Sequence, residues 1–252
     1  ELIEKLKAME FKRWNSQSED QLRDIGRLAF LPNGANFSVP GAGKTNALLA
    51  IHALERMQRP DIRLLVICPR NAMVSWDEEV RDCYGDDWSV TRLDGGKKKI
   101  EATLANNPPI SVISYQQVRG VVPQLISYMD RKPVHLVLDE SHRIKAGSSS
   151  LQGAASLELA AHAVRRDLLS GTPMPQGLSD LEAQFQFLWP SLSLFDGIPD
   201  NADTEEQVKM ANSLIRPLFV RTTKRELGLK NPRLRYHEIE MSPEQAEVYD
   251  LL

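Results

Sequence analysis

Two adjacent carboxylates, Asp139 and Glu140, have the types and spacing to do chemistry in this chain of 252 residues. They follow an apolar run in the segment LVLDESHRIK, residues 136–145. An apolar run that ends in acidic residues is typical of a buried parallel strand, which delivers them to the carboxyl edge of a sheet. At such an edge one carboxylate can hold Mg²⁺ through water, and the next can act on a water molecule. We therefore expect Asp139 to be a magnesium partner and Glu140 to be the general base, or to orient the attacking water.

A glycine-rich segment upstream, SVPGAGKT at residues 38–45, has the composition of a phosphate-binding loop. Glycines let backbone N–H groups approach phosphate oxygens, a lysine supplies a cation for the β- and γ-phosphates, and a threonine supplies a hydroxyl for Mg²⁺. Ser38 stands where the pattern usually has its first glycine, as in a looser version of the loop. The alternative is a plain glycine turn. The residues predicted to bind the nucleotide are Pro40, Gly41, Ala42, Gly43, Lys44, Thr45 and Asn46.

The loop and the acidic pair together predict hydrolysis of a nucleoside triphosphate, with Mg as an expected cofactor. Lys44, Asp139 and Glu140 are the candidate catalytic residues, and Thr45 and Asp139 the candidate metal ligands. His142 follows the acidic pair by two residues. It is either a structural histidine or a link from the nucleotide to another motif.

Strands and helices alternate along most of the chain, which predicts an α/β fold with a doubly wound, mainly parallel sheet and helices on both faces. The expected strands are residues 35–39, 63–68, 88–93, 110–114, 135–139 and 167–170. The expected helices are residues 1–9, 17–30, 44–57, 72–83, 98–106, 116–129 (broken by Pro123), 152–162 and 178–188. Residues 190–204 read as a linker or exposed loop.

The composition says more about the class of protein than about its binding partner. The net charge is -3, so no domain-wide basic field points to nucleic acid, although a local basic face would be hidden in the sum. The two cysteines indicate neither a disulfide framework nor a zinc site, which fits a reducing cytoplasm, or a nucleus in a eukaryote. No apolar run approaches the roughly 20 residues that cross a bilayer. The chain starts at Glu1 and stops in a helix-like stretch, so we expect a piece of a longer protein.

An ordered set of segments resembles superfamily-two helicases, and most closely the Swi/Snf-type DNA-translocating ATPases. DESHRIK is similar to their DExH box, and Gln21 stands at about the spacing of their adenine-reading glutamine. The family usually has Asp-Glu-Met-Gly-Leu before its GKT where this chain has residues 38–42, which suggests a divergent, prokaryotic or viral branch. The SGTP form argues against the RNA-directed DEAD-box branch. The other matching segments are residues 64–80, 110–118, 165–190, 219–227 and 239–249.

The resemblance implies the first of two RecA-like lobes, which bind ATP in the cleft between them. It divides the chain into an N-terminal helical segment with the adenine motif (1–33), a RecA-like P-loop core (34–190) and a linker and connector towards a second lobe (191–252). That second lobe would supply arginine fingers, worth about 10³–10⁵ in rate. We therefore expect this chain alone to bind ATP but to hydrolyse it weakly.

Family members move along double-stranded DNA by gripping its phosphates, for which hydroxyls, backbone N–H groups and cations are suitable. The resemblance makes Arg70, Ser75, Ser114 and Tyr115 the candidate DNA contacts. For Ser114 and Tyr115 the alternative is that they cap a strand and pack. Ser170, Gly171 and Thr172 are expected to couple the acidic box, through His142, to the DNA face, unless they form an ordinary turn.

Two other functions stay open on sequence. One is a superfamily-two helicase that acts on single-stranded DNA or RNA. The other is a nucleotide-binding scaffold without motor activity, although a scaffold has no need of Lys44, Thr45, Asp139 and Glu140 together.

Overall fold

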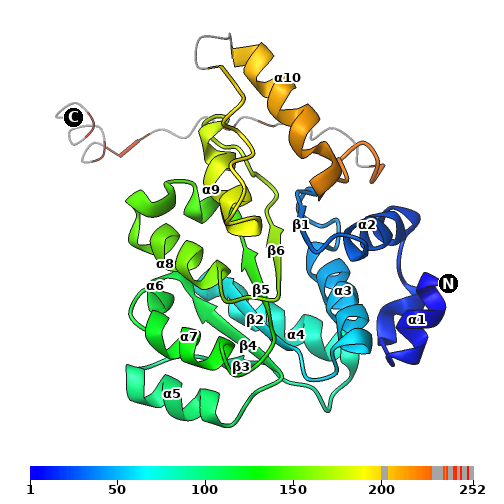
Figure 1. The fold of residues 1–252 in the computed structure, drawn as a ribbon. Coiled ribbons are helices and arrows are strands. Elements are labelled where there is room, and N and C mark those ends of the chain that lie inside the picture. Colours follow the sequence, from blue (N-terminus) through cyan, green and yellow to red (C-terminus); the bar gives the residue numbers. More distant parts are fainter. Residues whose placement is uncertain are drawn as a thin grey trace.

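One parallel sheet organises the molecule (Figure 1). The computed structural model describes residues 1–199 and 204–228, with 235, 237, 241, 242, 245 and 249. Within these residues seven strands pair in the order β3-β4-β2-β5-β6-β1-β7, and every pair is parallel. The strands are β1 Asn33–Asn36, β2 Arg63–Cys68, β3 Thr91–Arg92, β4 Ile110–Ser114, β5 Val134–Asp139, β6 Arg165–Leu169 and β7 Phe219–Val220.

Alternate residues of a strand point to opposite faces of the sheet. Since apolar residues lie on both faces, helices cover both of them. In β2, Leu65 and Ile67 join a core with α5 to α9, whereas Leu64, Val66 and Cys68 join a core with α1 to α4 (Figure 1). The doubly wound α/β prediction is therefore confirmed. The helices are α1 Leu2–Ala8, α2 Glu19–Ala29, α3 Lys44–Gln58, α4 Met73–Tyr84, α5 Lys97–Ala105, α6 Tyr115–Val118, α7 Val122–Met129, α8 Leu151–Ala160, α9 Ser179–Leu188 and α10 Thr204–Ile215.

The interior strands β2 and β4 have the predicted bounds, but three other predictions need correction. The first expected strand, residues 35–39, lies instead at Asn33–Asn36, and the strand expected at 88–93 is reduced to Thr91–Arg92. The helix expected at 116–129 is two helices, α6 and α7. Their break lies before Pro123, which stands in the first turn of α7, where a missing N–H is tolerated.

Residues 190–199 contain no helix or strand, and they lie within the segment that the sequence predicts to be a linker or exposed loop. Helix α10 follows at Thr204–Ile215, and β7 then pairs with β1 at the edge of the sheet. The connector-like segment thus contributes a strand to the same sheet as the phosphate loop. The segment expected at residues 239–249 lies mostly outside the described residues.

The carboxyl ends of β1, β5 and β6 lie side by side, since these three strands are neighbours in a parallel sheet. Their ends lead into the glycine-rich loop, the acidic pair and the SGTP segment, respectively. The order of the strands therefore brings together three segments that are far apart in the chain. None of the helices in the described part of the chain is long and apolar enough to span a membrane.

Candidate nucleotide site

The glycine-rich loop connects β1 to α3, and its geometry depends on Gly43. This residue adopts a left-handed conformation, with φ of 78°, at the position that caps α3. A Cβ atom there would lie 2.1 Å from Nε2 of Gln21, so the end of this side chain would have to move. Glycine is favoured at this position by its left-handed backbone, which strains any residue with a side chain.

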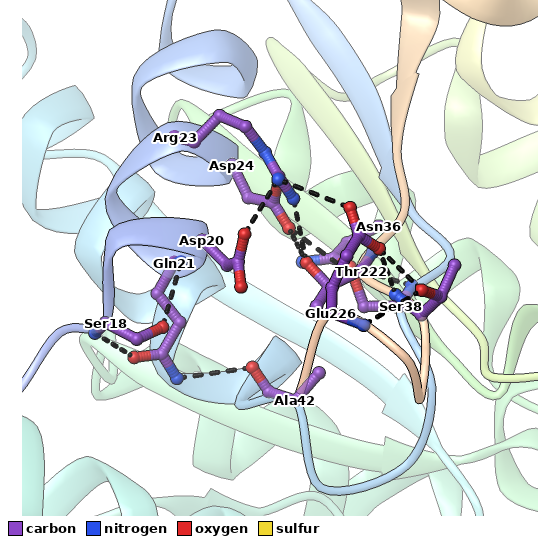
Figure 2. A network of polar contacts seen from close by, with 11 residues as sticks. Ser18, Asp20, Gln21, Arg23, Asp24, Asn36, Ser38, Ala42, Thr222 and Glu226 are labelled. Carbon is purple, nitrogen blue, oxygen red and sulfur yellow. Dashed lines mark hydrogen bonds and ion pairs between the residues drawn. The ribbon is translucent and has the colours of Figure 1, made fainter. Parts of the chain in front are cut away.

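Gln21 contacts the loop directly from the first turn of α2 (Figure 2). Its Nε2 donates a hydrogen bond to the carbonyl oxygen of Ala42 at 3.2 Å. Its Oε1 accepts from the backbone N–H of Ser18, which caps the helix in a reciprocal capping box. Gln17 makes a similar contact, because its Nε2 donates to Oδ1 of buried Asn46. This contact of Gln17 was not predicted from the sequence.

Lys44 begins α3 and turns back over the loop. Its Nζ donates to the carbonyl oxygen of Ser38 at 3.0 Å and lies 3.5 Å from that of Val39. Desolvation lowers the pKa of Lys44, whereas the negative charges of Glu140 and Asp139 act to raise it. The ammonium group is thus held by main-chain carbonyls within the field of both carboxylates.

Asp139 ends β5 and receives hydrogen bonds from two buried aromatic residues. The indole N–H of Trp76 in α4 donates to its Oδ2 at 2.9 Å, and the hydroxyl of Tyr115 donates to its main-chain oxygen at 2.9 Å. Burial raises the pKa of Asp139; the Trp76 hydrogen bond lowers it, and the neighbouring charge of Glu140 raises it. The hydrogen bond from Trp76 to Oδ2 therefore fixes the orientation of the Asp139 carboxylate.

Glu140 has a left-handed backbone, with φ of 53° and ψ of 52°, just before the 3-10 helix Ser141–Ile144. For a residue with a side chain this conformation costs roughly 1–2 kcal/mol. The sharp change of direction separates the two carboxylates: Asp139 is half-buried and bonded to Trp76, whereas the side chain of Glu140 is 42% exposed. Such strain is concentrated at functional sites, and the sequence gives no sign of it.

His142 joins the acidic pair to the SGTP segment. Its Nδ1 lies 3.2 Å from Oγ of buried Ser170 and 3.3 Å from Oε2 of Glu140. Ser170 Oγ also accepts from the backbone N–H of Thr172 at 3.2 Å. Gly171 packs against the phosphate loop, because a Cβ atom there would lie 2.9 Å from Cδ of Pro40. The four candidate coupling residues are thus adjacent, and they connect the loop with the acidic pair.

Gln184 in α9 is a further link that the sequence did not indicate. This buried amide accepts a hydrogen bond from Oγ of Ser141 at 2.6 Å and donates one to the carbonyl oxygen of Pro173 at 2.6 Å. It therefore ties the residue after the acidic pair to the end of the SGTP segment. No local pattern distinguishes Gln184 from other polar residues of an amphipathic helix.

The four candidate DNA contacts fall into two classes. Arg70, in the 3-10 turn Arg70–Ala72, and Ser75, in α4, are both exposed. Tyr115 is fully buried and its hydroxyl is bonded to Asp139, so the expectation that its side chain contacts DNA is wrong for this conformation. Ser114 is buried too, and its hydroxyl caps α6 by accepting from the N–H of Gln117. For these two residues the capping and packing alternative describes the structure.

Comparisons with known proteins agree on one family. A family model described as "SNF2-related domain" matches residues 35–252. The chain is 24% identical over 266 aligned residues to chromodomain-helicase-DNA-binding protein 6 of Homo sapiens, covering 96% of this chain and 10% of that protein. It is 27% identical to DNA repair protein RAD5A of Arabidopsis thaliana, covering 75% of this chain and 20% of that protein.

A solved structure has the same fold. It is described as the Sulfolobus solfataricus SWI2/SNF2 ATPase core in complex with dsDNA, and its TM-score is 0.67 at 21% sequence identity. The match covers 83% of this chain and 45% of the other. The chain thus spans a tenth to a fifth of the two curated relatives and less than half of this core.

Proposed function

The chain belongs to the SNF2-related domain family, and on that premise we propose that it is the first, ATP-binding lobe of a DNA-dependent ATPase that moves along double-stranded DNA. One observation carries the proposal. The glycine-rich loop, the acidic pair and the SGTP segment meet at the carboxyl ends of three adjacent parallel strands, which is where α/β sheets bind ligands.

The residues present fit ATP with Mg²⁺. Within the described residues there is no group of three or more His, Cys, Asp or Glu side chains that could hold a metal by itself. Magnesium commonly takes only one or two protein ligands and completes its shell with phosphates and water. Thr45 and Asp139 would be those ligands, and the bound ion would neutralise charge on the β- and γ-phosphates.

The protein residues have separate roles in this proposal. The loop around Gly43 presents backbone N–H groups to the phosphates, and Lys44 exchanges its carbonyl partners for phosphate oxygens. Gln21, at the edge of the loop, is the candidate for the adenine contact. Glu140, the more exposed carboxylate, accepts a proton from the attacking water or orients it. The hydrogen bond between His142 and Ser170 links this base to the SGTP segment.

DNA binding is proposed at the exposed residues Arg70 and Ser75, through phosphate contacts. Both precede or belong to α4, the helix whose Trp76 holds Asp139. Ser75 and Trp76 are adjacent in the chain. A movement of Ser75 on binding DNA would therefore also move Trp76, which is bonded to the proposed metal ligand Asp139. The relatives described as a chromodomain-helicase-DNA-binding protein and a DNA repair protein support DNA rather than RNA as the polymer.

The test is the ATPase rate of the whole natural protein with duplex DNA, single-stranded DNA and RNA added in turn. We expect duplex DNA to stimulate hydrolysis most. Greater stimulation by a single strand or by RNA would favour a strand-separating or RNA-directed helicase instead.

The substitution Glu140→Gln tests the assignment of the base. It should abolish turnover while ATP binding is retained, because the amide cannot accept the proton. Unchanged hydrolysis in this variant would overturn the assignment. If the whole wild-type protein binds ATP but hydrolyses none with any of the three polymers, the scaffold alternative is favoured.

A further inference from the structure

A buried polar cluster lies beside the phosphate loop and joins three distant segments of the chain (Figure 2). Asp24 comes from α2, Ser38 from the segment between β1 and the loop, and Thr222 from the residues after β7. Their exposures are 4%, 1% and 2%, respectively. A buried carboxylate is costly unless it is fully paired, so the partners of Asp24 are informative.

Both carboxylate oxygens of Asp24 have partners. Arg23 donates to Oδ1 from Nε at 3.0 Å and from a terminal nitrogen at 2.9 Å. The Thr222 hydroxyl donates to Oδ2 at 3.0 Å and accepts from Arg23 at 2.9 Å. The Ser38 hydroxyl makes a longer contact with Oδ2, at 3.4 Å. Asp24 thus holds Thr222 and Ser38 on the same oxygen.

Ser38 also connects this cluster to the phosphate loop. Its hydroxyl accepts the backbone N–H of Thr222 at 2.8 Å, and its carbonyl oxygen accepts Nζ of Lys44 at 3.0 Å. The backbone N–H of Val39 donates to the carbonyl oxygen of Thr222 at 3.1 Å. One residue therefore contacts the cluster through its side chain and the phosphate-binding lysine through its main chain.

We propose that Asp24 and Thr222 are positioning residues for ATP, which act through Ser38 to fix the loop and Lys44 in a binding-competent arrangement. The same bonds couple the chain that follows β7 to the nucleotide loop. The serine in the place of the usual first glycine has a function in this scheme, since glycine offers no hydroxyl to accept the N–H of Thr222. The inference rests on the proposed ATP-binding function and deepens it.

The experiment compares Thr222→Val with Thr222→Ser in the whole protein. Valine keeps the shape of threonine but loses the hydroxyl, whereas serine keeps the hydroxyl. The dissociation constant of a fluorescent ATP analogue and the KM and kcat for ATP are measured, with circular dichroism and thermal melting as checks of folding. Thr103→Val is the matched control, because its hydroxyl bonds only its own helix α5 on the surface.

We expect Thr222→Val to weaken ATP binding and raise KM about three- to tenfold, the worth of one net hydrogen bond, with a smaller effect on kcat. Thr222→Ser should restore binding to within about twofold, and Thr103→Val should leave it unchanged. If Thr222→Val does not fold, Asp24→Asn, which keeps an oxygen but loses the charge, gives the same comparison against wild type.

Three results separate the failure of this inference from failure of the proposed function. If wild-type protein binds ATP and folded Thr222→Val binds it equally well, the positioning role is wrong while the ATPase assignment stands. Loss of binding in both Thr222 variants alike would also reject it, because the hydroxyl would then not be responsible. If the wild-type protein does not bind ATP, the proposed function itself fails.

Discussion

At the scale of single residues, Asp139 shows how the site separates two carboxylates that are neighbours in sequence. Trp76 and Tyr115 both bond Asp139, but only Trp76 reaches its carboxylate, while Tyr115 reaches its main-chain oxygen. Glu140 turns away through its left-handed backbone. One acid is thereby fixed in the protein and the other is directed towards solvent, which are the environments that a metal ligand and a base require.

The substitution Trp76→Phe tests whether the indole orients Asp139. We expect the Mg²⁺ concentration for half-maximal ATP hydrolysis to rise about three- to tenfold, because one oxygen of the carboxylate loses its donor. Without the hydrogen bond that lowers it, the pKa of Asp139 rises further. The acid limb of kcat/KM should therefore move to higher pH. Magnesium titrations and pH profiles measure both effects.

Tyr115→Phe is the matched control for this variant, since it removes a hydrogen bond from the same residue without touching the carboxylate. Its magnesium requirement and acid limb should stay close to wild type, at a cost in stability of about 1 kcal/mol. If Trp76→Phe, Tyr115→Phe and wild type all show the same magnesium dependence, then Trp76 does not orient Asp139.

At the scale of elements, a second buried cluster joins α3 to β5 and β6, away from the nucleotide loop. Nδ1 of His52 lies 3.3 Å from Nδ1 of His135, whose Nε2 lies 2.7 Å from Oδ2 of Asp167. Arg165 donates to the same aspartate and to the carbonyl oxygens of Leu28 and Leu31. The helix that begins at Lys44 is thus connected near its middle to the two adjacent strands β5 and β6, which lead into the acidic pair and the SGTP segment.

The histidine pair predicts acid sensitivity of the fold. Burial lowers the pKa of His52, and so do the neighbouring His135 and arginine charges. Burial also lowers the pKa of His135, although Asp167 opposes this shift. Both rings are neutral in the fold but bind protons in the unfolded chain below a pH of about 6.5. The stability is therefore fully present above that pH and is lost as the pH falls, by up to about 1.4 kcal/mol per pH unit for each group.

Urea unfolding between pH 7 and pH 5 measures this slope. The variant His52→Leu should flatten it, because one of the two buried rings is then absent. The charged groups around the pair are Glu55 and Arg56 of α3, Arg63 of β2, and Arg165 and Asp167 of β6. A wild-type stability that stays constant across this range would contradict the prediction.

The local sequence pattern was sufficient to predict the bounds of elements that consist of one uninterrupted apolar run. The strand Arg63–Cys68 contains a run of apolar residues, Leu64–Cys68, that are buried on both faces, so its bounds were predictable. Pattern failed where long-range packing decides. Asp24 looks like a solvent-facing residue of an amphipathic helix, but its hydroxyl partner is Thr222, 198 residues away. Tyr115 has the right chemistry for a phosphate contact, and only the fold shows that its ring is buried.

At the scale of the whole molecule, the proposed nucleotide site lies at the carboxyl edge of one parallel sheet. The chain covers less than half of the SWI2/SNF2 core that it resembles, and the described residues supply the loop and both carboxylates. We expect the 252-residue chain by itself to bind ATP but to turn it over about 10³–10⁵ times more slowly than the whole protein, the usual worth of an arginine finger. Steady-state ATPase assays on both forms measure the ratio. Equal turnover would mean that this lobe is catalytically complete.

The place of β7 in the sheet has a consequence for the nascent chain. Strand β1, which carries the phosphate loop, pairs on one side with β6 and on the other with β7. The bond between Ser38 and Thr222 spans 184 residues. At a synthesis rate of about 5–20 residues per second, Ser38 leaves the ribosome roughly 10–40 s before its partner. During that interval β1 has an open edge, so the nucleotide loop is among the last parts of the described fold to reach its final form, although it is among the first to be made.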